Sequence, residues 1–189
     1  TFFIQFRLFR RRNKNLPGAG ERKPLLHCMK YAIVVLIGKP HTKRRKNKML
    51  YGFLWTTTEK EREQCFFVRK KVFMEEQGFQ NEFDQIDEIA HHLLFLDDET
   101  PIATARLFFY EDCWHIGRVC VLKKYRGNHI GQFLIEECLQ KAKELKQSKI
   151  IRLGAQVRAM EFYQKLGFSP CSETYDDEGC PHVMMEYRL

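Results

Sequence analysis

The sequence predicts an α+β fold, a mixed β-sheet of the α/β type that is covered by helices. Segments rich in β-branched and aromatic residues recur along the chain, and segments between them repeat apolar residues with helical spacing. The elements follow the order β-α-βββ-α-β-α-ββ. One strand-helix-strand crossover among strands joined by short turns requires both parallel and antiparallel neighbours in the sheet.

A short strand and a helix open the regular part of the chain. We expect the strand at residues 49–55. Thr58 and Glu61 have the spacing of a capping box, and apolar residues then recur on one helical face as far as Gly78, where the helix should stop. The residues of that face are Cys65, Val68 and Val72, flanked by Phe66 and Phe73.

Three strands follow as an antiparallel meander. Residues 92–96, 101–109 and 114–122 are rich in β-branched and aromatic side chains. The polar segments 97–100 and 111–113 separate them and have the composition of tight turns. Consecutive strands joined by such short turns pair with each other in antiparallel fashion.

The last third of the chain contains the crossover. Apolar residues recur along 130–146 with the spacing of a helix that packs one face on the sheet. A buried strand is expected at 149–155, and a helix at 157–166 should end at Gly167. The chain then closes as a hairpin with strands at 168–175 and 182–188.

Positive charge is concentrated at the start of the chain. The net charge is +8, but residues 1–48 hold fourteen Lys and Arg against one acid, and residues 49–189 hold eighteen against twenty-three. We therefore expect a basic leader at 1–48, outside a domain at 49–189. This leader could be a targeting peptide, a nucleic-acid-binding arm or non-native sequence. Translation could begin at Met29 or at Met49.

Composition argues against a membrane span, a disulfide scaffold and a metal centre. The apolar run 32–37 is far shorter than the roughly 20 residues that cross a bilayer. Seven cysteines include no CxxC pair, which favours reduced thiols and a cytoplasmic location. His91-His92 and His27-Cys28 each lack a second pair with zinc spacing, so we expect no metal.

The segment Val119–Gly131 has the composition of an anion-binding turn. A strand runs into a polar loop that contains Arg126 and Gly127 and opens directly into a helix. Amide N–H groups at a helix start point toward an anion, glycine lets a phosphate approach the backbone, and arginine adds charge. An ordinary strand-to-helix turn could have the same sequence, so the loop alone indicates a phosphate site without establishing one.

A set of short motifs places this loop in a wider pattern. In order, they are Val68–Gln77, Asp87–His92, Ala103–Leu107, Gly117–Val121 with the loop above, Gly154–Gln156 followed by Ala159, Phe162–Phe168 and Gly179–Met185. The motifs cover nearly all of 51–189 and none of 1–48. In this combination the chain resembles the GNAT superfamily of N-acetyltransferases, and most closely its small ElaA-like bacterial members.

The resemblance implies acetyl-CoA as cosubstrate and assigns a set of residues to it. Strand residues Val119 and Val121 would hydrogen-bond the pantetheine arm, where their strand splays from the strand at 149–155. Gln156 belongs to the same cofactor site. The diphosphate would lie against Arg126, Gly127, Asn128, His129, Ile130 and Gly131.

His129 departs from the family pattern, which usually has glycine at that position. A non-glycine residue held at positive φ costs on the order of 1 kcal/mol. This residue is therefore expected to weaken the affinity of the loop for the cofactor if it does not contact a phosphate itself.

The resemblance also implies direct attack by a primary amine on the acetyl group. Tyr163 matches the tyrosine that protonates the departing thiolate in this family. A tyrosine that only packs under the sheet could occupy the same position in the sequence. For the base, Glu76 and His182 are the candidates, and the ordinary pKa of imidazole, about 6.5, suits proton relay. A small-molecule amine or a protein amine could be the acceptor, and a homodimer through the last strands is implied by resemblance.

Two alternatives belong to other classes. A degenerate GNAT-fold binding module would keep the fold with a weakened CoA site. A nucleic-acid-binding protein led by the basic arm is disfavoured by the net acidic domain. Acids at Glu75, Glu76, Glu82, Asp84, Asp87 and Glu88 would favour a cationic acceptor if they faced the groove.

Overall fold

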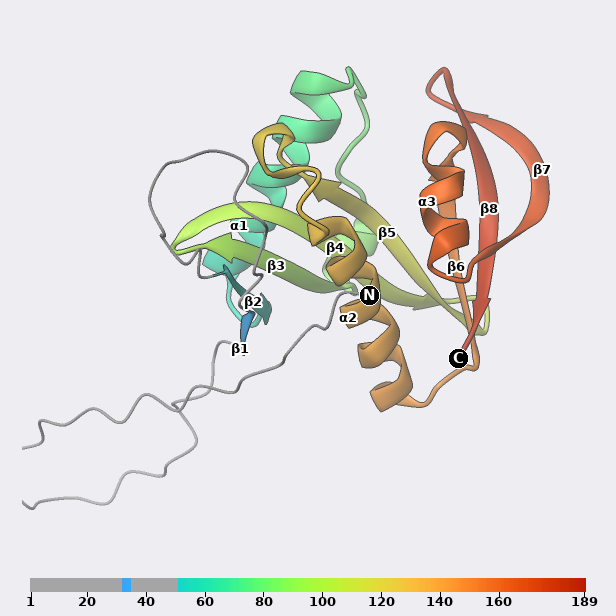
Figure 1. The fold of residues 1–189 in the computed structure, drawn as a ribbon, viewed down its shortest axis with the longest axis horizontal. Helices are drawn as coiled ribbons and strands as arrows, with labels where there is room; N and C mark the ends of the chain where they lie inside the picture. Colours follow the sequence, from blue (N-terminus) through green and yellow to red (C-terminus); the bar gives the residue numbers. More distant parts are fainter. Residues whose placement is uncertain (1–31, 35–50) are drawn as a thin grey trace, which may run out of the picture.

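The structure is a computed structural model that describes residues 32–34 and 51–189 (Figure 1). The leader predicted at 1–48 lies outside the described residues, except for one short strand that the sequence did not predict. The strands are β1 (Ala32–Val34), β2 (Tyr51–Trp55), β3 (His91–Asp97), β4 (Thr100–Tyr110), β5 (Cys113–Val121), β6 (Ile150–Gln156), β7 (Ser169–Asp177) and β8 (Cys180–Arg188). The helices are α1 (Glu59–Arg69), α2 (Ile130–Leu145) and α3 (Met160–Lys165).

The eight strands of residues 32–34 and 51–189 belong to one mixed sheet. Their order is β1-β2-β3-β4-β5-β6-β8-β7, and only the β5–β6 pair is parallel. From β2 onward the element order is the predicted β-α-βββ-α-β-α-ββ, so the predicted fold class is confirmed. The crossover from β5 through α2 to β6 produces the single parallel pair, because only a crossover connection returns the chain in the same direction.

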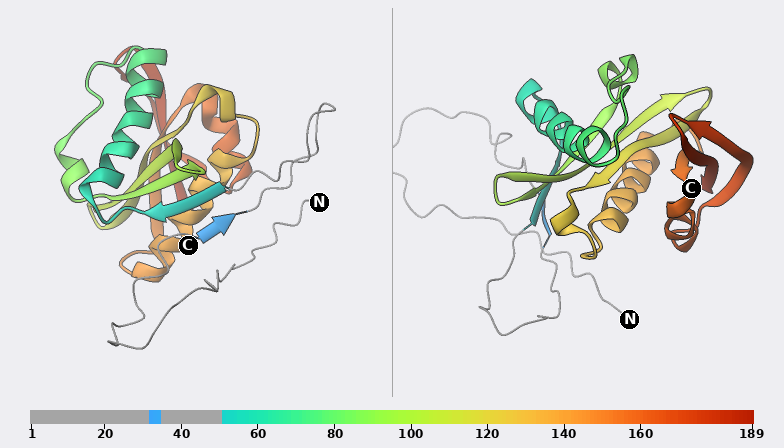
Figure 2. Two further views of the ribbon diagram at one scale, coloured as in Figure 1. Left: turned by 90° about the vertical axis from the view of Figure 1, so that its left-hand side faces the viewer. Right: turned by 90° about the horizontal axis from the view of Figure 1, so that it is seen from above.

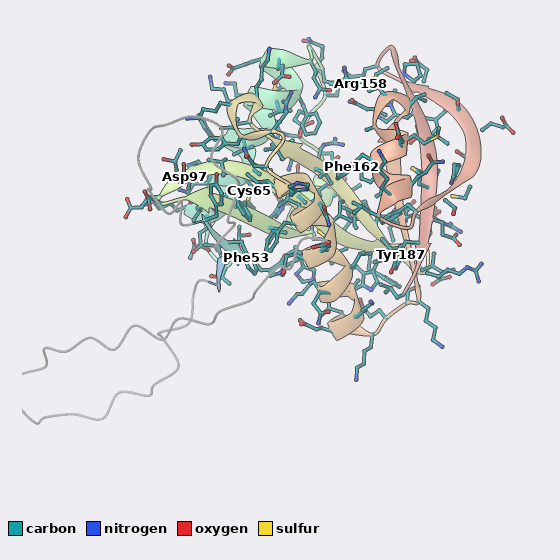
Figure 3. All side chains as sticks on the ribbon, viewed as in Figure 1. Phe53, Cys65, Asp97, Arg158, Phe162 and Tyr187 are labelled. Carbon is teal, nitrogen blue, oxygen red and sulfur yellow. The ribbon has the colours of Figure 1, made fainter. Side chains whose placement is uncertain are left out.

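Helices cover both faces of the sheet (Figure 2). Alternation along β3 explains this, because successive side chains of a strand point to opposite faces. Leu93 and Phe95 belong to the core beneath α2, which also contains Phe133. Leu94 packs instead with Cys65 of α1 on the other face. The aromatic ring of Phe53, labelled in Figure 3, lies edge-on against Phe133, with centroids 4.9 Å apart.

The first helix begins at the predicted capping box and then changes its winding. The Thr58 hydroxyl accepts from the backbone N–H of Glu61 at 3.4 Å, and the Glu61 carboxylate accepts from that of Thr58 at 3.0 Å. The prediction of a single helix as far as Gly78 is wrong in one respect. A π-helical segment, η2 (Lys70–Glu76), follows α1. π-helical turns are rare and frequently occur at functional sites.

Strand β5 separates from β6 after two residues. The parallel ladder joins Trp114 to Ile151 and His115 to Arg152 and goes no further. Downstream, the β4–β5 register shifts between Thr104 and Arg106, which places an extra residue in β5. Within this bulge, Arg118 has φ +52°, a left-handed conformation that costs about 1 kcal/mol or more for a residue with a side chain.

A buried ion network ties α1 to the loop before β3. The Arg69 side chain is 1% exposed and donates to the Glu82 carboxylate at 2.7 Å and to that of Asp87 at 2.6 Å. Burial pushes the pKa of Asp87 upward, but its hydrogen bonds to Arg69 and Arg106 outweigh burial and hold that pKa below its usual range. The Asp87 carboxylate is therefore ionised at neutral pH.

The same network reaches the sheet at the bulge. Arg106 of β4 donates to Asp84 at 2.7 Å and to Asp87 at 2.8 Å. Arg118 lies 3.1 Å from the Glu82 carboxylate and 3.2 Å from that of Asp84. The arginine with the left-handed backbone is thus held by two carboxylates of the neighbouring loop.

We predict that Arg69→Met destabilises the protein strongly. Removing one partner leaves Glu82 and Asp87 as buried charges with fewer counter-ions, which costs about 3 to 5 kcal/mol. Urea unfolding measures the change in the free energy of unfolding. Arg62→Met is the matched control, because Arg62 lies two turns earlier in α1 and pairs near the surface with Glu59, where the expected cost is about 0 to 1 kcal/mol. Equal losses in the two variants would contradict a stabilising role for the network.

Candidate active site

The loop between β5 and α2 has the backbone of an anion-binding turn. Gly127 has φ +80° and His129, which is the N-cap of α2, has φ +59°. The expected positive φ of His129 is therefore confirmed. The Asn128 side chain donates to the backbone carbonyl of Tyr125 at 3.0 Å and stabilises the turn.

The start of α2 completes this turn. Phe133 is the residue whose N–H bonds back to the His129 carbonyl, at 3.1 Å. Ile130, Gly131 and Gln132 lie in the first turn of α2, before Phe133. Their N–H groups have no carbonyl of the same helix to bond to, because no earlier turn exists. These amides and the helix dipole suit an anion, so the residues present fit a diphosphate.

Arg126 connects the loop to the end of η2. Its guanidinium makes a two-point contact with the Glu76 carboxylate, at 2.7 and 2.8 Å, and its Nε donates to the Val121 carbonyl at 2.9 Å. The hydrogen bonds from Arg126 hold the pKa of Glu76 below its usual range. The predicted cofactor ligand and the predicted base are thus partners in this conformation.

Val119 and Val121 lie on the part of β5 that has left β6. Both follow His115, the last β5 residue in the parallel ladder, so their edge is not paired with β6. An unpaired strand edge presents alternating N–H and C=O groups to an amide-bearing ligand. The splay expected between β5 and the strand after α2 is confirmed.

Tyr163 of α3 belongs to the main buried core, which also contains residues of β5, β6 and α2. It is 9% exposed, and its ring contacts Phe162 and Phe168 edge-on, at centroid distances of 5.0 and 6.1 Å. Burial, with smaller contributions from the thiols of Cys120 and Cys138, raises the pKa of Tyr163. The phenol is therefore protonated at neutral pH.

His182 lies in β8 opposite Gln156 of β6. The imidazole is 7% exposed and stacks on Tyr175 with ring centroids 5.9 Å apart. Its Nδ1 lies 2.7 Å from the Cys180 carbonyl, which can only accept, so Nδ1 carries the proton in this contact. In the neutral ring, Nε2 is then the nitrogen that can take up a proton.

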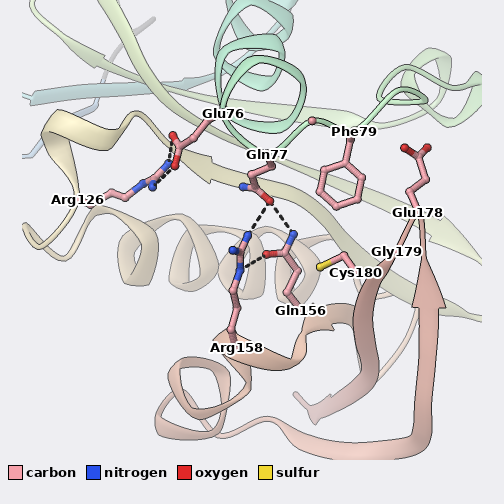
Figure 4. Close-up of a pocket in the computed structure, with 10 residues that line it drawn as sticks. Glu76, Gln77, Phe79, Arg126, Gln156, Arg158, Glu178, Gly179 and Cys180 are labelled. Atoms are coloured by element: carbon pink, nitrogen blue, oxygen red, sulfur yellow. Dashed lines mark hydrogen bonds and ion pairs between the residues drawn. The ribbon is translucent and has the colours of Figure 1, made fainter.

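A polar pocket of about 660 Å³ lies between η2, the end of β6 and the β7–β8 turn (Figure 4). Gln77 bridges its walls, because its side-chain oxygen accepts from Gln156 at 2.8 Å and from Arg158 at 2.9 Å. Glu178 ties the β7–β8 turn to the opposite wall by accepting from the N–H groups of Gln80 and Asn81, at 2.7 and 3.1 Å. The lining residues are Glu76, Gln77, Gly78, Phe79, Arg126, Gln156, Arg158, Glu178, Gly179 and Cys180.

A sequence profile of the family described as "Acetyltransferase (GNAT) domain" matches residues 52–189. This chain belongs to the GNAT acetyltransferase family. Membership implies acyl transfer from acetyl-CoA, and it agrees with the anion-binding turn and the splayed strands described above.

Individual relatives agree with the family assignment. An uncharacterized N-acetyltransferase of Bacillus subtilis (strain 168), YjcF, is 32% identical over 130 residues, which are 67% of this chain and 92% of the relative. The crystal structure of Escherichia coli ElaA superposes with a TM-score of 0.65 at 29% identity, covering 72% of this chain and 97% of ElaA. A GNAT family acetyltransferase from Elizabethkingia anophelis, solved with acetyl-CoA bound, shares the fold with a TM-score of 0.59 at 16% identity, covering 74% of this chain and 98% of that protein.

The acids that could have made the groove of this acetyltransferase negative are paired. Glu82, Asp84 and Asp87 bond to the arginines of the buried network. The remaining three pair as Glu75 with Lys71, Glu76 with Arg126 and Glu88 with Arg62. Because each carboxylate has a cationic partner, this cluster gives no preference for a cationic acceptor.

Cys120 of the acetyltransferase is a poor nucleophile despite its place on β5. Its side chain is buried, and burial raises the pKa of the thiol. Among residues 32–34 and 51–189, no group of three or more His, Cys, Asp or Glu is arranged to hold a metal ion. In the same part of the chain, no helix has the length and apolar character of a membrane span.

The sequence did not identify several pocket residues of the acetyltransferase. Gln77 and Gly179 fall inside the family motifs, but no signal gave them a role. Arg158 lies two residues beyond the end of β6, the strand that splays from β5. Phe79, Glu178 and Cys180 reach the pocket only because η2 and the β7–β8 turn meet in space.

We predict that His129→Gly preserves or tightens acetyl-CoA binding. Glycine relieves the left-handed strain of about 1 kcal/mol at this N-cap and leaves the amides of α2 in place. Isothermal calorimetry with acetyl-CoA measures the dissociation constant. Gly127→Ala is the reverse control, because an added β-carbon there meets no atom within 4 Å and only the φ of +80° opposes it, so we expect about 1 kcal/mol lower unfolding free energy. A large loss of acetyl-CoA affinity in His129→Gly would show that the imidazole itself contacts the cofactor.

Proposed function

We propose that this protein transfers the acetyl group of acetyl-CoA to a primary amine by direct attack, without a covalent enzyme intermediate. The observation that carries the proposal is the departure of β5 from β6 directly before an anion-binding turn at the start of α2. A small-molecule amine or a protein amine is the acceptor. The bound cosubstrate supplies an activated acyl carbon and a thiolate leaving group.

The backbone and the loop arginine hold the cosubstrate. The diphosphate binds at the amides of Gly127 to Gly131, and Arg126 turns from the Glu76 carboxylate to the phosphates, exchanging one anionic partner for another. The edge at Val119 and Val121 that is not paired with β6 hydrogen-bonds the amides of the pantetheine arm, and the Val121 carbonyl is released when Arg126 turns to the phosphates. Gln156 supports the same site through its side-chain amide, which already bridges to Gln77.

Tyr163 serves as the proton donor. A carbon–nitrogen bond forms as the amine attacks, the carbon–sulfur bond breaks, and the phenol proton goes to the sulfur. The raised pKa of Tyr163, caused mainly by burial, keeps the phenol protonated until that moment. The thiols of Cys120 on β5 and Cys138 on α2 also contribute to the raised pKa of Tyr163, which supports a position of the phenol near these two elements.

His182 is the better of the two base candidates. Glu76 pairs with Arg126 through both carboxylate oxygens, so we assign it the role of holding that arginine before acetyl-CoA binds. His182 has Nδ1 committed to the Cys180 carbonyl, so Nε2 is left as the basic nitrogen. We assign to His182, directly or through water, the proton that the ammonium must lose before it can attack.

We predict that Tyr163→Phe lowers kcat about 100-fold or more and leaves the KM for acetyl-CoA nearly unchanged, because loss of a general acid typically costs two to four orders of magnitude. Free-thiol release over a panel of amines measures both constants. Tyr110→Phe removes a hydroxyl that is exposed on β4 and serves as the control. If Tyr163→Phe kept full activity, the phenol would have a packing role only. A wild type that is stabilised by acetyl-CoA in a thermal shift but releases no thiol would favour the binding-module alternative.

We predict opposite outcomes for the two base candidates. His182→Gln should lower kcat at pH 7 by about 10-fold to 1000-fold, and the loss should shrink as pH rises toward about 10, where an amine deprotonates unaided. Glu76→Gln should keep kcat and leave the KM for acetyl-CoA equal or lower, because Arg126 no longer has a competing carboxylate. Steady-state kinetics from pH 6 to 10 distinguishes the two, and a fall in kcat confined to Glu76→Gln would reverse the assignment.

A further inference from the structure

The pocket contains one arginine whose contacts are all to neutral groups. Arg158 donates through Nε to the Gln156 side-chain oxygen at 2.9 Å and through Nη2 to that of Gln77 at 2.9 Å. Among the described residues, no carboxylate lies within 4.0 Å of its guanidinium. Amide oxygens accept hydrogen bonds but do not neutralise a charge, and a guanidinium stays protonated at any physiological pH.

The other charges of the pocket are already committed. Arg126 and Glu76 form a closed pair, and the Glu178 carboxylate accepts from two backbone N–H groups. With two arginines and two acids in its lining, the pocket is formally neutral as a whole. Among the lining residues, Arg158 is the cation that the proposed diphosphate site leaves unused, so the pocket suits an acceptor that has an anionic group in addition to its amine.

The geometry of Arg158 leaves room for such a group. An arginine has five N–H donors, of which the two amide contacts use two, so Nη1 and the second N–H of Nη2 remain for a planar carboxylate. Gln77 and Gln156 fix the guanidinium plane from both sides of the pocket (Figure 4). In Figure 3 the residue lies at the same end of the molecule as the β7–β8 turn, whose Glu178, Gly179 and Cys180 line the pocket with it.

We propose that Arg158 forms a subsite for a carboxylate on the acceptor, so that the acceptors of this enzyme are amino acids or similar amines with an acidic group nearby. This inference rests on the proposed acetyl transfer and names the class of its acceptor. The diphosphate has its own ligands, the α2 amides and Arg126, which leaves Arg158 to the acceptor.

The test compares amines that differ only in the carboxylate. The full-length protein is assayed by free-thiol release with three pairs: lysine and cadaverine, ornithine and putrescine, phenylalanine and phenylethylamine. Calorimetry of wild type with acetyl-CoA tests the proposed function independently of any acceptor. We expect at least one pair in which kcat/KM is about 10-fold or more higher for the amino acid, because charge-assisted hydrogen bonds would be lost without the carboxylate.

Arg158→Gln removes the charge and keeps a hydrogen-bonding side chain. It should raise the KM for the amino acid about 10-fold to 100-fold, leave the decarboxylated amine within about twofold, and leave the KM for acetyl-CoA within about twofold. Arg158→Lys should retain part of the preference, and Arg62→Gln on α1 should change nothing. A rise in the KM for acetyl-CoA with both acceptors would overturn the proposal and make the anion a phosphate of CoA. A second result would also overturn the proposal. In it, the wild type binds acetyl-CoA, but in every pair it either prefers the decarboxylated amine or uses neither amine.

Discussion

The separation of β5 from β6 is the constraint on which the rest of this protein depends. Parallel strands normally stay paired along their length, yet these two share only the pairs Trp114–Ile151 and His115–Arg152. The bulge at Arg118 bends β5 away, and a left-handed arginine is unfavourable unless its surroundings hold it. Glu82 and Asp84 do so, and they are in turn fixed by Arg69 and Arg106. The buried ions are thus part of what shapes the cleft.

This arrangement links stability to function through one loop. The segment between η2 and β3 supplies the carboxylates of the network on one side and the walls of the pocket, at Gly78 and Phe79, on the other. Glu178 reaches the same segment from the β7–β8 turn. The two halves of the sheet that part at β5 and β6 are therefore joined again above the pocket by side chains rather than by strand pairing. Side-chain bridges of this kind can open for a ligand at lower cost than a β-ladder.

Contacts across the pocket also decide which of its charged side chains are paired with an opposite charge. Glu76 and Arg126 are far apart in sequence and meet because η2 ends beside the loop before α2. Their contact lowers the pKa of Glu76 and occupies the guanidinium of Arg126, which we propose as a ligand of the diphosphate. Arg158 has only amide partners in the same pocket. Arg126 has a carboxylate partner and Arg158 has none, and we therefore assign Arg126 to the cofactor and Arg158 to the acceptor.

The sequence alone determined the order of elements from β2 onward, the capping box at Thr58 and Glu61, the family, and the positive φ at His129. These depend on local spacing or on motifs that are contiguous in the chain. It could not determine the π-helical turn Lys70–Glu76, the bulge at Arg118, or the pairing of the six acids with arginine and lysine side chains. Most of those ion pairs join distant segments, such as Glu76 with Arg126 and Glu82 with Arg69, and a charge has no defined environment until its partner is in place. Only the tertiary structure therefore decided which candidates share a pocket and which of its charges is left for a substrate.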